Sequence, residues 1–305
     1  MEIIRILKNC EQRKALVFGI GGGGDIVATI PTANFLRCFG FDVLHGSIVW
    51  DRLVVDPKPG PRSIEELENV EVFNDVIAIA NENTRTYYGA IPTVARASKF
   101  FGRVIALDIT KGAKKLSKGL KEFAEENEIS LIVGIDSGGD AIAIGYESGV
   151  ESPLADAMSI AALSDLNAII GVFGFGSDGE LKVEELLLNM SELLKRKCFL
   201  GCASMSEKDY NEMVEITKFV VTEASKIPII AYEGEFGIKK IRESRTVIVS
   251  PLSTLTFYFT SKGVFEINKA AKIVKDAGNI EEANSLLNKS GILTELDYER
   301  AVAKN

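Results

Sequence analysis

The chain contains few of the residues that form the commonest catalytic and metal-binding motifs. Its only histidine is His45, which excludes a multi-histidine metal site and disfavours a Ser-His-Asp triad. The sequence also lacks the GxSxG nucleophile motif and the GxxxxGKS/T phosphate-binding motif, so the usual serine hydrolases and P-loop kinases are disfavoured. Any acid–base chemistry would therefore depend on carboxylates, lysines or tyrosines.

Cysteines and long apolar runs are also scarce. The four cysteines are widely spread and form no CxxC pair, so we interpret them as reduced thiols of a cytoplasmic protein rather than as zinc ligands. No run of 18 apolar residues occurs, and the first residues are charged throughout. We therefore expect neither membrane insertion nor secretion.

Basic residues are fewer than acidic residues in this chain. The chain has 35 Lys and Arg against 43 Asp and Glu, a net charge of −8, whereas proteins that bind nucleic acids or anionic membranes depend on excess cations. We expect neither nucleic acid nor a membrane as a partner. The 305 residues are 46% hydrophobic and 26% charged, which is typical of a folded protein with a sizeable core.

Short β-branched runs alternate with longer helical patterns along the chain. This alternation predicts an α/β fold, with a Rossmann-like, mostly parallel sheet and helices on both faces. We interpret residues 1–305 as one domain with a C-terminal strand–helix extension over 245–305. Glycine loops at 19–25 and 134–140 share a glycine, an isoleucine, paired glycines and an aspartate, so two related halves are an open alternative.

The pattern also places individual elements. Alternating apolar and polar residues over 254–260 predict a half-exposed strand, antiparallel or at a sheet edge. Helices are expected over 26–39, 113–126, 153–163, 183–196, 209–225, 266–277 and 280–288. Other strands are expected over 15–20, 43–49, 76–80, 104–108, 131–135, 168–173, 227–231 and 247–250.

The first glycine-rich loop matches the GxGxxG dinucleotide fingerprint. Gly19, Gly21 and Gly24 lie between a predicted strand and a predicted helix, where backbone N–H groups could bind a pyrophosphate. This match keeps an NAD(P)-binding oxidoreductase among the alternatives. Asp25 follows directly, and its carboxylate would repel a bound phosphate but fits either a helix N-cap or a cation ligand.

The second glycine-rich loop is acidic. Asp136 and Asp140 enclose Gly138 and Gly139 after another predicted strand. Carboxylates at such a position suit either a hard cation such as Mg²⁺ or the hydroxyls of a sugar. A surface turn built from Asp and Gly is the plainer alternative.

Two more acids, Glu147 and Asp156, follow this loop. If Ser152 caps the next helix, the acid of a capping box should fall at Ala155, so Asp156 is not needed for capping. The candidate catalytic residues are therefore Asp140, Glu147 and Asp156, and the candidate metal ligands are Asp25, Asp136 and Asp140.

A third glycine-rich loop, with Gly174 and Gly176, follows a further predicted strand. The carboxyl ends of strands form the ligand crevice of open α/β sheets, so the three loops would converge if their strands are neighbours. The candidate cofactor-binding glycines therefore include Gly138, Gly139, Gly174 and Gly176 beside those of the first loop. Arg62, in a proline-rich loop, and Lys111, at a helix start, are candidate partners of a ligand anion. Ordinary solvation of the lysine is the plainer alternative.

Motifs distributed over nearly the whole chain resemble one known family. They are Gly21-Gly-Gly-Gly-Asp25, Trp50-Asp-Arg52, residues 56–62, Asp136-Ser-Gly-Gly-Asp140, Ser152-Pro-Leu-Ala-Asp156 and Thr256-Phe-Tyr-Phe259. Together they are similar to the mainly archaeal family catalogued as domain of unknown function 1152. The resemblance implies an intracellular, archaeal protein with a Rossmann-like parallel sheet, and it implies no reaction and no catalytic residue.

These observations favour one function over two alternatives. The favoured interpretation is an enzyme that acts on a nucleotide or another phosphorylated small metabolite with a divalent cation, Mg²⁺. The alternatives are an NAD(P)-binding oxidoreductase and a non-catalytic nucleotide-binding sensor. The substrate, the reaction and the oligomeric state, including a homo-oligomer, are left open.

Overall fold

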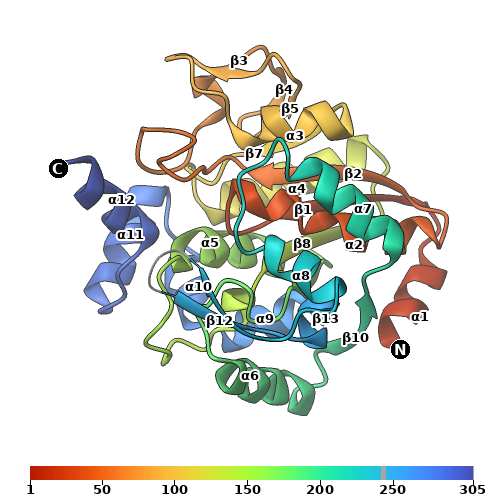
Figure 1. Ribbon diagram of the computed structural model, residues 1–305. Helices are drawn as coiled ribbons and strands as arrows, with labels where there is room; N and C mark the ends of the chain where they lie inside the picture. The colour runs from red at the N-terminus through yellow and green to blue at the C-terminus, as the bar shows by residue number, and fades with distance from the viewer. Residues whose placement is uncertain (242–244, 305) are drawn as a thin grey trace.

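The computed structural model describes residues 1–241 and 245–304. These residues form a nine-stranded sheet in the order β10-β13-β9-β8-β1-β2-β7-β5-β4, with helices packed around it (Figure 1). The strands are β1 (Lys14–Gly19), β2 (Asp42–Ile48), β4 (Glu71–Asn74), β5 (Ile77–Ala80), β7 (Val104–Leu107), β8 (Leu131–Ser137), β9 (Ile169–Phe173), β10 (Phe199–Ser204) and β13 (Leu255–Thr260). The predicted α/β class is confirmed.

The centre of the sheet is parallel and buried on both faces. β9, β8, β1, β2 and β7 pair in parallel. Alternate residues of β1 enter two separate apolar cores: Leu16 and Phe18 lie in one, and Ala15 and Val17 lie in the other. Because side chains alternate along a strand, the apolar run at β1 indicates that both faces of the sheet are covered.

The helices divide between these two cores. The core with Leu16 receives apolar residues from α4 (Ala113–Glu126), α5 (Pro153–Ser164), α6 (Val183–Lys195), α9 (Ser261–Ile267), α10 (Lys269–Val274), α11 (Ile280–Lys289) and α12 (Glu295–Ala303). The opposite core receives them from α1 (Glu2–Asn9), α2 (Thr29–Arg37), α3 (Thr93–Phe101), α7 (Glu207–Ile216) and α8 (Lys226–Tyr232).

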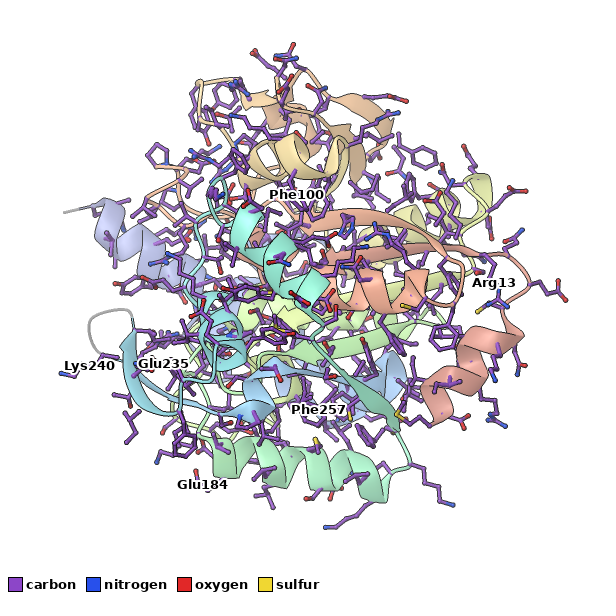
Figure 2. All side chains as sticks on the ribbon, turned by 45° about the vertical axis from the view of Figure 1, so that its right-hand side comes forward. Arg13, Phe100, Glu184, Glu235, Lys240 and Phe257 are labelled. Atoms are coloured by element: carbon purple, nitrogen blue, oxygen red, sulfur yellow. The ribbon has the colours of Figure 1, made fainter. Side chains whose placement is uncertain are left out.

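The prediction for 254–260 is correct in direction but wrong in exposure. β13 is antiparallel to β9, and β10 pairs antiparallel with its other side. Phe257 and Phe259 lie in one core and Tyr258 lies in the other. Figure 2 shows Phe257 inside the outline of the molecule, whereas Glu184 of α6 lies at its rim. The strand is interior because β10, which the sequence pattern did not predict, covers its outer edge.

Several predicted boundaries are also wrong. Residues 227–231 form part of helix α8 rather than a strand, because Pro228 lies in the first turn, where its missing N–H is not needed. The helix expected over 209–225 ends at Ile216, and the one expected from 26 begins as the 3₁₀ helix η1 (Gly23–Ile26). The helix expected over 266–277 is broken at Asn268, whose side chain accepts a hydrogen bond from the Ala271 N–H at 2.8 Å.

Two small two-stranded sheets lie outside the main sheet. β11 (Gly237–Ile241) pairs with β12 (Arg245–Val249), and β3 (Leu67–Glu68) pairs with β6 (Arg85–Thr86). Lys240 of β11 lies at the edge of the molecule in Figure 2. No helix among the described residues has the length and apolar character needed to cross a membrane.

Candidate metal centre

The three glycine-rich loops meet at the carboxyl ends of β1, β8 and β9, which are neighbours in the sheet. The Ile20 N–H donates to the Ile135 carbonyl at 2.9 Å, which joins the first loop to β8. The Gly176 N–H donates to the Gly138 carbonyl at 2.7 Å, which joins the third loop to the second. The condition for convergence of the loops, that their strands are neighbours, is therefore met.

Three buried aspartates form the core of this region. Asp136 ends β8, Asp140 begins the 3₁₀ helix η3 (Asp140–Ile142), and Asp178 lies in the loop after β9. One carboxylate oxygen from each lies within 4.8 Å of the others, and the residues are only 2%, 7% and 4% exposed. Mg²⁺ and Ca²⁺ bind oxygen ligands at about 2.0–2.6 Å, so a single ion could reach all three. We call these three residues the aspartate triad.

The electrostatic environment of the triad opposes ionisation. Burial raises the pKa of Asp136 well above its usual range, and the charges of Asp25 and Asp178 raise it further. Burial likewise raises the pKa of Asp140, which also lies near Asp156 and Glu180. A bound cation would reverse this preference, because an opposite charge at short range favours the ionised carboxylate. The triad therefore has the chemistry of a site for a hard cation.

Glycine is required in the second loop for steric reasons. Gly138 and Gly139 have φ angles of 134° and 135°, which favour glycine. A Cβ on Gly138 would lie 2.0 Å from Oδ2 of Asp178, and one on Gly139 would lie 2.6 Å from Cδ2 of Leu186. These two predicted cofactor-binding glycines thus allow the backbone to approach the triad and α6, and their contact with a ligand stays a prediction.

Asp25 and Asp156 lie beside the triad and face each other across Gly21. The Gly21 N–H donates to Oδ2 of Asp25 at 2.9 Å. A Cβ on Gly21 would lie 2.7 Å from Oδ2 of Asp156 and 2.8 Å from Oδ2 of Asp25. Burial raises the pKa of Asp156 well above its usual range, and the charges of Asp136 and Asp25 raise it further. The structure therefore brings Asp25, Asp136, Asp140 and Asp156 together, as the convergence argument requires.

Glu180 forms the rim of the site. Its carboxylate accepts hydrogen bonds from Oγ of Ser152 at 2.5 Å and from the Glu151 N–H at 2.8 Å. Arg245 of β12 pairs with it at 3.1 Å. The Ser152 hydroxyl therefore donates to Glu180, and its side chain does not cap α5.

The acid that caps α5 comes from the far end of the chain. Glu295, the first residue of α12, accepts hydrogen bonds from the Leu154 N–H at 3.0 Å and the Ala155 N–H at 2.7 Å. Burial raises the pKa of Glu295 to about 8, against the lowering effect of these hydrogen bonds. Asp178, Glu180 and Glu295 were all missed from the sequence. A signal existed for the first two, because they lie directly after Gly174 and Gly176 of the third glycine-rich loop, but no local signal marks Glu295.

Three other predicted site residues are engaged elsewhere. Glu147 accepts hydrogen bonds from the Ile144 N–H at 2.9 Å and from Nδ2 of Asn189 at 2.7 Å, which close its own loop. These and other hydrogen bonds hold the pKa of the Glu147 carboxyl below its usual value despite burial. Arg62 pairs with buried Asp56 at 3.0 Å. Lys111 contacts Glu65 and donates to the Asp75 carbonyl at 2.7 Å. Catalysis by Glu147 and anion binding by Arg62 and Lys111 stay predictions.

The backbone of the first loop is largely satisfied by the protein itself. Besides the Gly21 N–H, the Gly23 N–H donates to the Trp50 carbonyl at 2.9 Å, and the Asp25 N–H donates to the Gly22 carbonyl at 3.1 Å. Gly19 is required because a Cβ there would lie 2.6 Å from Cβ of Asp25, whereas a Cβ on Gly24 would meet its nearest neighbour, Thr222, only at 3.5 Å. These hydrogen bonds give no support to a pyrophosphate at this loop, and NAD(P) binding stays a prediction.

The glycines of the third loop shape its turn. Gly174 and Gly176 have φ angles of 70° and 77°, in the left-handed region that favours glycine. The Ser177 N–H donates back to the Gly174 carbonyl at 2.7 Å. This turn carries the chain from β9 to Asp178, so both glycines help to position the triad.

Comparison with known proteins gives one match. A family model described as "Protein of unknown function (DUF1152)" matches residues 16–303. No curated protein and no solved structure matches the chain.

Proposed function

The chain belongs to the DUF1152 family, and we propose that it is an enzyme that uses a divalent cation to act on a phosphorylated small molecule. The observation that carries this proposal is the aspartate triad, in which three buried carboxylates lie within 4.8 Å of one another. Buried carboxylates repel one another strongly, and a hard divalent cation is the ligand that converts this repulsion into attraction. The triad would hold the ion, which would supply a centre of positive charge.

The place of the triad in the fold supports a small-molecule ligand. Ligands of open α/β sheets bind outside the carboxyl ends of the strands, which is where Asp136 and Asp140 lie. Mg²⁺ is usually bound by one or two carboxylates together with substrate phosphates. A nucleotide or a sugar phosphate would thus bind through the cation, because the aspartates alone would repel its phosphate.

The test is cation binding followed by a ligand screen. Mg²⁺ and Mn²⁺ are titrated by calorimetry into the wild-type protein, Asp140→Asn and the matched control Asp165→Asn, whose carboxyl lies at the surface and pairs with Lys275 at 2.7 Å. We expect Asp140→Asn to weaken cation binding by at least about tenfold, since it removes a direct ligand, and the control to bind as the wild type does.

Thermal unfolding with nucleotides and sugar phosphates, each with and without Mg²⁺, then identifies the substrate class. A ligand at about 100 times its Kd adds about 2.7 kcal/mol to the stability. A shift that requires both the phosphorylated compound and Mg²⁺ supports the proposal. Cation binding that is equal in Asp140→Asn and the wild type would contradict it, and a Mg²⁺-independent shift with NAD(P) would favour an oxidoreductase instead.

A further inference from the structure

Asp25 and Asp156 form a second pair of carboxylates next to the triad but outside it. We infer that this pair binds a second divalent cation, so that the site is a two-cation centre. The inference rests on the proposed function and deepens it, because a pair of cations would bind the two sides of one phosphate group.

The two carboxylates approach each other closely at Gly21. Oδ2 of Asp25 and Oδ2 of Asp156 both lie within 2.8 Å of one point, which is the position that a Cβ on Gly21 would occupy. The φ angle of Gly21 is not in the left-handed region, so its backbone does not require glycine. A side chain is excluded here by the carboxylates, and its absence lets two potential ligands of one ion lie close together.

Asp156 supplies an independent observation. It is only 3% exposed, and its Oδ1 is buried with no hydrogen-bond partner among residues 1–241 and 245–304. A buried polar atom that is left unsatisfied costs about 1–3 kcal/mol, and more if it is charged. Protein folds rarely retain such an atom unless a ligand satisfies it, and next to Asp25 and Asp136 that ligand would have to be positive.

Asp136 connects the pair to the triad. The charge of Asp25 acts on it from the pair, and the charge of Asp178 acts on it from the triad. A carboxylate in this position can contact both ions through its two oxygens. Two-metal sites place their ions about 3.5–4 Å apart and bind the two sides of one reacting group, and a phosphate of the substrate has the oxygens to bridge them.

The experiment counts bound ions with Mn²⁺ alone as the probe. Equilibrium dialysis and metal analysis should find about two Mn²⁺ per wild-type chain, and electron paramagnetic resonance should show the spin coupling of two close ions. We expect Asp156→Asn to retain about one Mn²⁺ per chain and to lose the coupling. Gly21→Ala should give the same result without removing any carboxylate, because its Cβ would displace the carboxylates of Asp25 and Asp156.

The controls distinguish the possible failures. Gly278→Ala, where a new Cβ would meet only Oε2 of Glu282 at 3.3 Å, should bind as the wild type does, and circular dichroism establishes that each variant is folded. A single, uncoupled Mn²⁺ in the wild type, lost in Asp140→Asn, would overturn the second site but leave the proposed function intact. Two coupled ions in both Asp156→Asn and Gly21→Ala would also overturn it. No Mn²⁺ in the wild type would refute the proposed function itself.

Discussion

Two groups of buried acids lie at the same edge of the sheet and have opposite surroundings. In the loop after β2, which we call the proline loop (residues 56–62), Asp56 pairs with Arg62 at 3.0 Å and accepts the Tyr88 hydroxyl at 2.7 Å. Glu299 of α12 accepts Nε1 of Trp50 at 3.1 Å and the Gly60 N–H at 2.7 Å. In the aspartate triad, by contrast, the carboxyls face other carboxyls.

This difference separates acids that stabilise the fold from acids that are available for chemistry. Asp56 pairs with a cation and Glu299 accepts two hydrogen bonds, and such contacts hold a loop in one conformation. Asp136 and Asp178 also accept backbone hydrogen bonds, but their carboxylates lie against other carboxylates. Burial raises the pKa of Asp136 and of Asp140, and the charges of neighbouring carboxylates raise both further, so a fold gains nothing from that arrangement by itself. Perturbed, clustered acids are a common property of functional sites.

The largest expected effect comes from breaking the proline loop. Arg62→Ala leaves Asp56 buried without its cation, and removal of one partner of a buried ion pair costs about 3–5 kcal/mol. Urea unfolding of the cation-free protein measures this loss. The control is Arg52→Ala, whose exposed ion pair with Glu223 should contribute no more than about 1 kcal/mol.

Cation binding gives the second half of this test. Arg62→Ala should retain the Mn²⁺ affinity of the wild type, provided that the variant is still folded under the conditions of the measurement. If Arg62→Ala instead had normal stability but no longer bound the cation or a phosphate, Arg62 would be a ligand-binding residue. The sequence analysis predicted this role for it.

Removal of a carboxylate from the triad should raise the stability of the protein, whereas Arg62→Ala lowers it. Asp140→Asn removes one of several mutually repelling carboxyls, so we expect the cation-free protein to become more stable, by about 1–3 kcal/mol. The same variant should gain little stability when Mg²⁺ is added. Urea unfolding in the presence of a chelator and then in Mg²⁺ measures both effects, with Asp165→Asn as the control. Destabilisation of the cation-free variant would show that Asp140 stabilises the fold.

The sequence could predict the triad only in part. Asp136 and Asp140 were identified because they follow a recognisable buried strand. Asp178 was missed because only the glycines of its loop were considered as ligand-binding residues, whereas their positive φ angles turn the chain so that a carboxylate reaches the site. The pairing of β9 with β8, which brings Asp178 to Asp136, is a long-range contact that no local pattern encodes.

The same limitation explains the errors in the fold. β10 contains Gly201, Cys202 and Ala203, which lack the β-branched pattern of a strand, so it was not predicted. The alternation of apolar and polar residues then favoured a half-exposed strand at 254–260. The proline-rich loop was recognised in the sequence, but Glu299, which accepts the Gly60 N–H and holds the loop in place, lies more than two hundred residues away along the chain. Local patterns therefore predicted the central parallel strands and failed where distant segments complete a layer or a site.

The dependence of stability on pH should distinguish the contribution of the aspartate triad from that of His45, the only histidine of the chain. His45 stacks on Phe101 at 3.9 Å between ring centroids and bonds to Oγ1 of Thr29 at 2.8 Å. Burial, followed by the charge of Arg37, lowers its pKa to about 3 from an unperturbed 6.5. The unfolded chain therefore takes up a proton below pH 6.5 that the folded protein refuses until about pH 3, and His45 makes the fold less stable throughout this range.

The raised pKa values of Asp136 and Asp140 act in the reverse direction, because the folded protein then binds protons more tightly than the unfolded chain. The contribution of His45 can be isolated by comparison with His45→Gln in urea unfolding from pH 7.5 to 4.5. We expect the stability of the wild type to fall relative to the variant by about 1.4 kcal/mol per pH unit well below pH 6.5. Parallel pH profiles would mean that His45 is protonated in the fold, and a loss of stability in acid would then have to come from carboxyls whose pKa the fold lowers, such as Glu66 and Glu147.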